Sequence, residues 1–225
     1  MRRVAVVLLL SAVSTAAWAG PFSRPFRPTR AAVRAAIRNA KTIKSAEARN
    51  QLLENSAYRL TSDLSVTQLT TLVREMTSPQ VQDRAVRAFV GAHATELSID
   101  EVVKVSAEIQ SAYPSTYHEA IAANERAAAQ ASRKEDALLF LGYVRHPGYD
   151  EVAQGRAMVM RNREMLAQQK AAIDEATDRL RDGVLLSYYE LRGSLGAADL
   201  LKLAQAARLS STRTFFEDRA AMGSR

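Results

Sequence analysis

Three histidines, His93, His118 and His146, are the side chains of this 225-residue chain best suited to metal binding or acid–base chemistry near neutral pH. No two of them stand four residues apart, so the His-Glu-x-x-His motif of zinc proteases is absent. The chain also has no cysteine, which excludes thiolate metal sites, thiol nucleophiles and disulfide frameworks. We therefore expect no metal centre and no cofactor, and we interpret the histidines as helix-end or surface residues.

The best candidate for a catalytic site is a loop. The chain lacks a Gly-x-Ser-x-Gly elbow, a glycine-rich phosphate loop and a dinucleotide-binding fingerprint. Residues 142–149 form the densest non-helical segment after the N-terminal region, and they combine titratable, cationic and aromatic side chains in Tyr143, Arg145, His146 and Tyr149. The alternative is a simple turn between helices with the aromatic rings packed below it. The sequence therefore favours a non-enzymatic protein, with an uncharacterised hydrolase as the third hypothesis.

A basic segment near the N-terminus is the clearest candidate for binding. The whole chain has a formal net charge of +7, whereas residues 50–225 carry a net charge of −2. The excess lies in residues 24–49, where Glu47 is the one acidic residue among eight basic ones. We assign seven of these cations to an anion-binding or partner-binding surface: Arg24, Arg27, Arg30, Arg34, Arg38, Lys41 and Lys44.

The spacing of these cations predicts a basic amphipathic helix. At about 100° per residue, the cations from Arg30 to Lys44 fall within roughly a third of the helix circumference. Apolar residues such as Val33 and Ala40 lie beside and behind them. An anionic membrane surface, an envelope polymer or an acidic protein would fit this surface, and nucleic acid is disfavoured because an exported protein seldom meets it. The alternative is a solvated helix that pairs with acidic residues of the rest of the protein.

The first twenty residues have the pattern of a secretory signal. Arg2 and Arg3 precede an apolar run over residues 4–13, and Ala17-Trp18-Ala19 supplies the small-x-small cleavage pattern. The run is shorter than the ~20 residues that a membrane-spanning helix needs. We expect residues 1–19 to be a cleaved signal peptide, so that the mature chain is periplasmic or extracellular and keeps no transmembrane segment. An uncleaved signal anchor is the alternative.

Helix-forming residues dominate the rest of the chain. Alanine occurs 40 times, against 9 glycines and 6 prolines, which predicts an all-α protein. Prolines bias residues 20–28 to an extended Pro/Phe/Arg segment. We expect residues 29–225 to be a single all-helical domain. The composition is helical throughout residues 30 to about 59, and a long helix is expected over 149–181 that ends near Gly183 as C-cap.

Helix start signals recur 33 residues apart. The segments 64–69 and 97–102 each contain a capping box, Ser-x-x-Gln in the first and Ser-x-x-Glu in the second. Each is followed by a second start signal, at Pro79 and at Pro114. This spacing predicts stacked helical hairpins of an α-solenoid-like kind. An irregular helical bundle is the alternative, because capping boxes occur in any α-helical protein.

The first capping box carries a resemblance to a known family. Residues 64–68, Leu-Ser-Val-Thr-Gln, are similar to the Leu-Thr-x-x-Gln signature of small helical periplasmic chaperones, with Ser in place of Thr. In the second copy Glu101 replaces the Gln, and this chain is longer than the usual members. The resemblance covers five residues and implies a holdase-type chaperone with an exposed apolar face.

These observations predict an exported, non-enzymatic binding or structural protein of the bacterial cell envelope. It would contact an anionic surface or partner through its basic N-terminal helix. A periplasmic holdase-type chaperone is the alternative.

Processing after Ala19 removes Trp18, which is the one tryptophan of the chain. We expect the exported protein to show tyrosine fluorescence only, and its N-terminal residue to be Gly20. A precursor purified with residues 1–19 attached is the control and should show tryptophan emission. Tryptophan emission from the exported protein would contradict cleavage at this site.

Overall fold

The protein is all-α throughout residues 30–140 and 147–223, the parts of the chain that the computed structural model describes. In these ranges it forms nine α-helices and one short 3₁₀ helix, and no β-strand. This confirms the all-α fold that the composition predicts. The helices are α1 (Arg30–Thr42), α2 (Ala46–Leu60), η1 (Thr61–Asp63), α3 (Val66–Arg74), α4 (Pro79–His93), α5 (Ile99–Ser106), α6 (Ser115–Phe140), α7 (Pro147–Arg192), α8 (Ala197–Ala206) and α9 (Ser210–Gly223).

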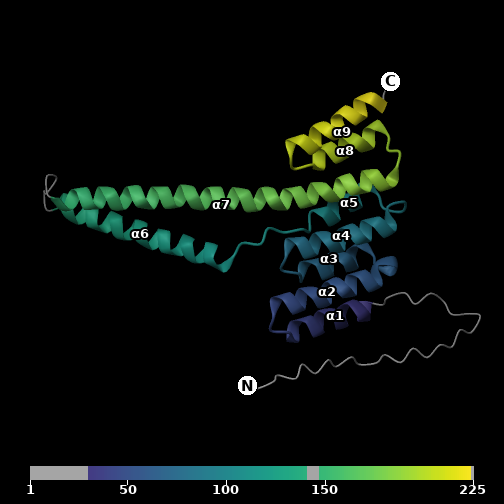
Figure 1. The fold of residues 1–225 in the computed structure, drawn as a ribbon, viewed down its shortest axis with the longest axis horizontal. Helices are drawn as coiled ribbons and strands as arrows, with labels where there is room; N and C mark the ends of the chain where they lie inside the picture. Colours follow the sequence, from purple (N-terminus) through teal and green to yellow (C-terminus); the bar gives the residue numbers. More distant parts are fainter. Residues whose placement is uncertain (1–29, 141–146, 224–225) are drawn as a thin grey trace, which may run out of the picture.

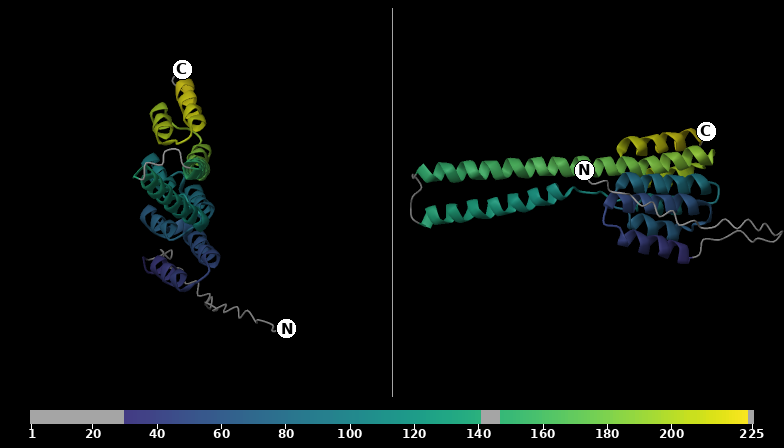
Figure 2. Two further views of the ribbon diagram at one scale, coloured as in Figure 1. Left: turned by 90° about the vertical axis from the view of Figure 1, so that its left-hand side faces the viewer. Right: turned by 60° about the horizontal axis from the view of Figure 1, so that its bottom comes forward.

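The helices form two parts of different shape (Figures 1 and 2). The body, residues 30–106 and 177–223, is a succession of packed helices that begins with α1 and ends with the α8–α9 pair. Neighbours in this succession include α1 with α2, α2 with α4, and α4 with α7. The long hairpin, residues 115–140 and 147–176, is the antiparallel pair of α6 and the N-terminal part of α7. It extends away from the body.

One hydrophobic core runs through the body from Val33 in α1 to Ala220 in α9. It consists mainly of Leu, Val, Ile and Ala, as the low aromatic content suggests, with Tyr188 and Phe216 as its largest fully buried side chains. The Tyr188 hydroxyl donates to the carbonyl oxygen of Leu97 at 2.9 Å. No residue of the long hairpin belongs to this core cluster. The hairpin is therefore attached through the continuation of α7 rather than through shared apolar packing.

Both predicted capping boxes are present. The Ser65 hydroxyl accepts from the backbone N–H of Gln68, and the Gln68 side-chain oxygen accepts from the backbone N–H of Ser65 at 2.8 Å. Ser98 and Glu101 make the same pair at the start of α5. The bonds from the Ser98 backbone and hydroxyl lower the pKa of the Glu101 carboxyl. These bonds satisfy amide groups that the first turn of a helix leaves unpaired.

The two start signals lead into different packing arrangements. After α3, the chain turns at Ser78 into α4, which begins with Pro79 and packs against α2 and α3. After α5, the chain enters α6 at Ser115, and α6 makes its main contacts with α7. The 33-residue spacing therefore describes repeated helix starts, while the helices that follow them do not form equivalent hairpins.

The stretch of helical composition over residues 30–59 forms two helices, since α1 ends at Thr42 and α2 begins at Ala46 after Ser45, whose hydroxyl caps it. No glycine or proline marks this break. The predicted end of the long helix near Gly183 is wrong: α7 continues to Arg192, and Gly193 follows it with a positive φ of 78° that suits a glycine after a helix C-terminus.

Gly183 serves close packing instead of helix termination. A Cβ atom at this position would lie 2.1 Å from Nη2 of Arg87, a residue of α4. The Arg87 guanidinium donates to Asp83 at 2.7 Å and to the Ser187 hydroxyl at 2.9 Å. The missing side chain at Gly183 thus makes room for the arginine that crosses from α4 onto α7.

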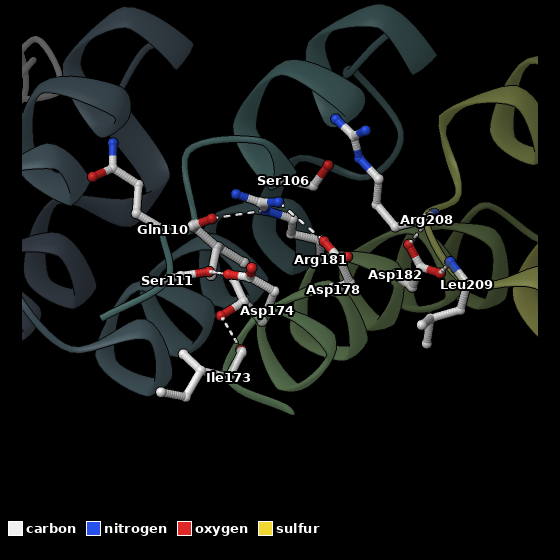
Figure 3. A network of polar contacts seen from close by, with 12 residues as sticks. Ser106, Gln110, Ser111, Ile173, Asp174, Asp178, Arg181, Asp182, Arg208 and Leu209 are labelled. Atoms are coloured by element: carbon white, nitrogen blue, oxygen red, sulfur yellow. Dashed lines mark hydrogen bonds and ion pairs between the residues drawn. The ribbon is translucent and has the colours of Figure 1, made fainter. Parts of the chain in front are cut away.

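The α8–α9 pair is held to α7 by a buried carboxylate (Figure 3). Asp182 is 1% exposed, and its two oxygens accept from the backbone N–H groups of Arg208 and Leu209, each at 2.9 Å. These amides lie in the turn between α8 and α9. One side chain therefore satisfies two backbone donors that have no helical partner.

The contact between Arg87 and Gly183 is testable by a double-mutant cycle. Alanine in place of glycine inside a helix contributes about 1 kcal/mol of stability. We expect Gly183→Ala to raise the free energy of unfolding by about 1 kcal/mol in an Arg87→Ala background, and by clearly less in the wild type, where the methyl group displaces Arg87. Urea unfolding measures both differences.

Gly155→Ala is the matched control for this cycle, because a Cβ atom at Gly155 meets nothing within 4 Å. Its effect should be the same in both backgrounds. If Gly183→Ala also has equal effects in both, the close approach of Arg87 does not constrain position 183.

Candidate functional site

The predicted basic helix corresponds to α1, and its cations face away from the body. Arg30, Arg34 and Arg38 are exposed. On the other side of α1, Val33 and Ala40 are buried in the core, at 4% and 1% exposure. Helix α1 is thus fastened to the body by its apolar side and presents its arginines to solvent.

Most of these α1 cations lack a partner. Within the described ranges, no carboxylate pairs with Arg30, Arg34 or Arg38, whereas Lys41 pairs with Glu75 at 3.1 Å. Lys44 is exposed but lies in the link between α1 and α2 rather than on the helix. Among the cations of α1, Lys41 alone therefore pairs with a described acidic residue of the body, as the alternative of a solvated helix expects.

Two other arginines of the body are used differently. Arg74 donates two hydrogen bonds to Glu108, both at 2.6 Å, and Arg84 donates two to Glu54 at 2.5 and 2.9 Å. Hydrogen bonding to these carboxylates raises the pKa of both guanidinium groups. This contrast identifies the exposed face of α1, Arg30, Arg34 and Arg38, as a separate basic surface.

Several predicted site residues lie outside the described ranges. These are Arg24 and Arg27 of the basic segment, and Tyr143, Arg145 and His146 of the loop. Tyr149 lies in the first turn of α7, so the segment predicted to be non-helical already turns helical at Pro147. The described residues do not bring the loop site together.

The two histidines in the described ranges, His93 and His118, pack against aromatic rings. Nε2 of His93 lies 2.8 Å from the carbonyl oxygen of Thr61, and its ring packs on Phe89. His118 lies edge-on to Tyr113 and Tyr117. Among the described residues, no group of three or more His, Asp or Glu side chains is arranged to hold a metal ion.

The long hairpin carries a surface that the sequence did not suggest. A groove of about 940 Å³ runs between α6 and α7, and a second of about 550 Å³ lies nearer the link between them. Met158, Met160 and Met165 are exposed on α7, by 66%, 54% and 59%. A cation recurs every seven residues along the α7 side of the larger groove, at 156, 163 and 170, and this period marks one face of a helix without identifying the helix that packs beside it.

The base of the hairpin is fastened by a carboxylate in α7. Asp174 accepts hydrogen bonds from Lys170 at 2.5 Å, from the Tyr113 hydroxyl, and from Ser111 at 2.9 Å. These donors lower the pKa of Asp174 from 3.8 to about 2. Tyr113 also stacks on Tyr117, with ring centroids 5.2 Å apart. The segment that precedes α6 is thereby attached to α7.

A neighbouring arginine extends this attachment (Figure 3). Arg181 donates to the carbonyl oxygen of Ile109 at 2.8 Å and to Asp178 at 3.0 Å. Together with Asp174 it connects α7 to the segment after α5. The groove therefore begins at a fixed base rather than at a loose joint.

The chain was compared with family models, with curated proteins and with solved structures, and none of them matches it. No helix in the described ranges is both long and apolar enough to cross a membrane.

Titration of Asp174 should make stability depend on acid pH. Its folded-state pKa lies below the ordinary value, so its contribution is present above about pH 4 and is lost as the pH falls toward about 2. We expect the stability difference between the wild type and Asp174→Asn to shrink over this interval. Because the Asp174 side chain is 35% exposed, solvent screening keeps the difference modest. Chemical denaturation of both proteins at several pH values measures it, and a constant difference would contradict this role.

Proposed function

We propose that this chain is an exported, non-enzymatic binding protein of the bacterial cell envelope that contacts an anionic surface through the exposed face of α1. The observation that carries the proposal is the row of Arg30, Arg34 and Arg38, exposed and without carboxylate partners in the described ranges. Export is supported by the signal-like pattern of residues 1–19.

The geometry of α1 favours surface contact over insertion. Val33 and Ala40 are already buried in the core, so they are not available to enter a lipid layer. Binding then rests on charge, at about 1 kcal/mol per basic residue near an anionic surface. Such attraction is screened over roughly 10 Å at 0.1 M salt. Binding should consequently weaken steeply as salt is added.

Lipid headgroups and acidic envelope polymers share the chemistry that this surface would recognise. The three arginines are four residues apart, so they follow one side of α1 with a rise of about 6 Å between successive positions. Guanidinium groups can engage phosphate or carboxylate groups with two hydrogen bonds each. A repeating array of such anions fits this row better than a single small ligand.

A holdase-type chaperone is the second candidate. It is favoured by the three exposed methionines of α7, Met158, Met160 and Met165, because flexible thioether side chains suit surfaces that accept varied apolar partners. This function would place the binding surface on the long hairpin rather than on α1.

Charge reversal tests the α1 surface. We expect Arg30→Glu, Arg34→Glu and Arg38→Glu together to weaken binding to vesicles containing about one-third phosphatidylglycerol by about 100-fold or more, because three attractive contacts become repulsive. Vesicle co-sedimentation at low and high salt measures this, and a soluble polyanion such as dextran sulfate tests the polymer source. Circular dichroism should remain helical.

The matched control reverses the same number of exposed cations elsewhere, as Arg133→Glu, Arg161→Glu and Lys202→Glu. It should keep most of the binding. If the two triple variants bind equally, or if the wild type binds neither vesicles nor polyanion at low salt, the α1 face is not the contact surface.

A further inference from the structure

We propose that the larger groove of the long hairpin binds an acidic amphipathic helix of a partner protein, which completes a three-helix bundle with α6 and α7. The groove is lined by residues of the long hairpin. The proposed anionic contact lies on α1, at the start of the body and apart from the hairpin (Figure 1). The inference is therefore independent of the proposed function.

The hairpin buries few of its own side chains. Between residues 115 and 173, Tyr117, Val152 and Leu166 are the buried side chains among those described. Helices in water gain most of their stability from packing an apolar face against another element. Two helices with three buried side chains over this length leave such faces uncovered, and a third helix would cover one of them.

The lining of the groove suits the close approach of a helix. Ala128 and Ala131 of α6 and Ala157 and Ala167 of α7 lie along it, and small side chains allow helix axes to come near one another. Larger apolar contacts are available from side chains such as Ile121. This combination resembles the interface of a helical bundle more than the enclosed pocket of a small ligand.

The cations that line the groove indicate that the bound helix is acidic. Arg156, Arg163 and Lys170 line it at intervals of seven residues, which corresponds to about 10.5 Å along α7. Glu125 is the one acidic residue in this lining. Arg156 pairs with Glu135 and Lys170 with Asp174, while Arg163 has no ion pair or hydrogen bond within the described ranges. A helix with carboxylates at every seventh position would be complementary.

This spacing favours a helix over an extended polypeptide. In an extended chain, side chains three residues apart span about 10 Å but point to opposite sides. In a helix, side chains seven residues apart cover the same distance and lie on one face. A helix thus presents a carboxylate to each of the three cations from one face, whereas a straight extended chain presents the middle carboxylate on the opposite side.

A polar atom in the groove also lacks a partner. The side-chain oxygen of Asn124 is shielded from solvent and accepts no hydrogen bond from any described residue. Shielded polar atoms are normally hydrogen-bonded. If the Asn124 amide turns toward the groove, a donor side chain on the bound helix would satisfy it.

Designed peptides test the proposal with the full chain. The probe is a labelled amphipathic helical peptide with an apolar face of Leu and Ala and with Glu at every seventh position beside that face. The control peptide has Lys at those positions. We expect fluorescence anisotropy to show at least about ten-fold tighter binding of the Glu peptide, because like charges at the rim oppose the Lys peptide.

Arg163→Glu should weaken binding of the Glu peptide by about three- to ten-fold, since it replaces an attractive contact with a repulsive one without breaking an internal pair. Arg161→Glu is the matched control: it makes the same charge change on α7 but lies outside the groove lining, and it should leave affinity nearly unchanged. Ala167→Trp should block the groove, while Ala172→Trp, outside it, should not.

Three results would overturn the proposal. Equal affinity for the Glu and Lys peptides, or no binding of either, would show that the groove does not bind an acidic helix. Equal binding of a proline-containing Glu peptide that cannot form a helix would show that the groove accepts extended segments, as a holdase requires. A dimer in sedimentation that Ala167→Trp dissociates would show that a second copy of this chain fills the groove. None of these results bears on vesicle binding by α1.

Discussion

The shape of this protein depends on the continuity of α7. The C-terminal part of this helix is buried in the body, and its N-terminal part is largely exposed in the long hairpin. Val184, Leu185 and Tyr188 are almost fully buried in the core, so this end of α7 is held firmly against the body. Helix α7 is one uninterrupted α-helix from Pro147 to Arg192, and no proline follows Pro147 within it. The direction of the long hairpin is therefore determined by the packing of α7 many residues away.

Polar side chains on a short stretch of α7 complete this attachment. Asp174 binds the segment before α6, Arg181 binds the segment after α5, and Asp182 binds the turn between α8 and α9. The hairpin and the body share no apolar cluster. Directional hydrogen bonds thus provide the connection that apolar packing does not, and they place the base of the groove at a fixed point.

Two surfaces with different chemistry result from this arrangement. The face of α1 offers arginines while its apolar residues are already used in the core, which suits an extended anionic surface. The groove of the hairpin combines alanines, apolar side chains and spaced cations, which suits a folded segment. In the body, by contrast, the guanidinium groups of Arg74 and Arg84 each pair with a carboxylate. The three arginines of the α1 face and Arg163 of the groove have no such carboxylate partner within the described ranges.

Local sequence patterns suffice to predict the helical class, the starts of α3, α4 and α5, and the basic face of α1. Each depends on residues a few positions apart: the bonds of Ser65 with Gln68 close within one helical turn, and the spacing of Arg30 and Arg34 follows from the helical period. The role of Gly183, the partner of α6 and the existence of the groove depend instead on contacts between helices that are distant in the chain. A C-cap and a close helix crossing both call for glycine, and only the position of Arg87 on another helix distinguishes them. The groove likewise needs residues of α6 and α7 that lie far apart in the chain, so no local pattern could place them together.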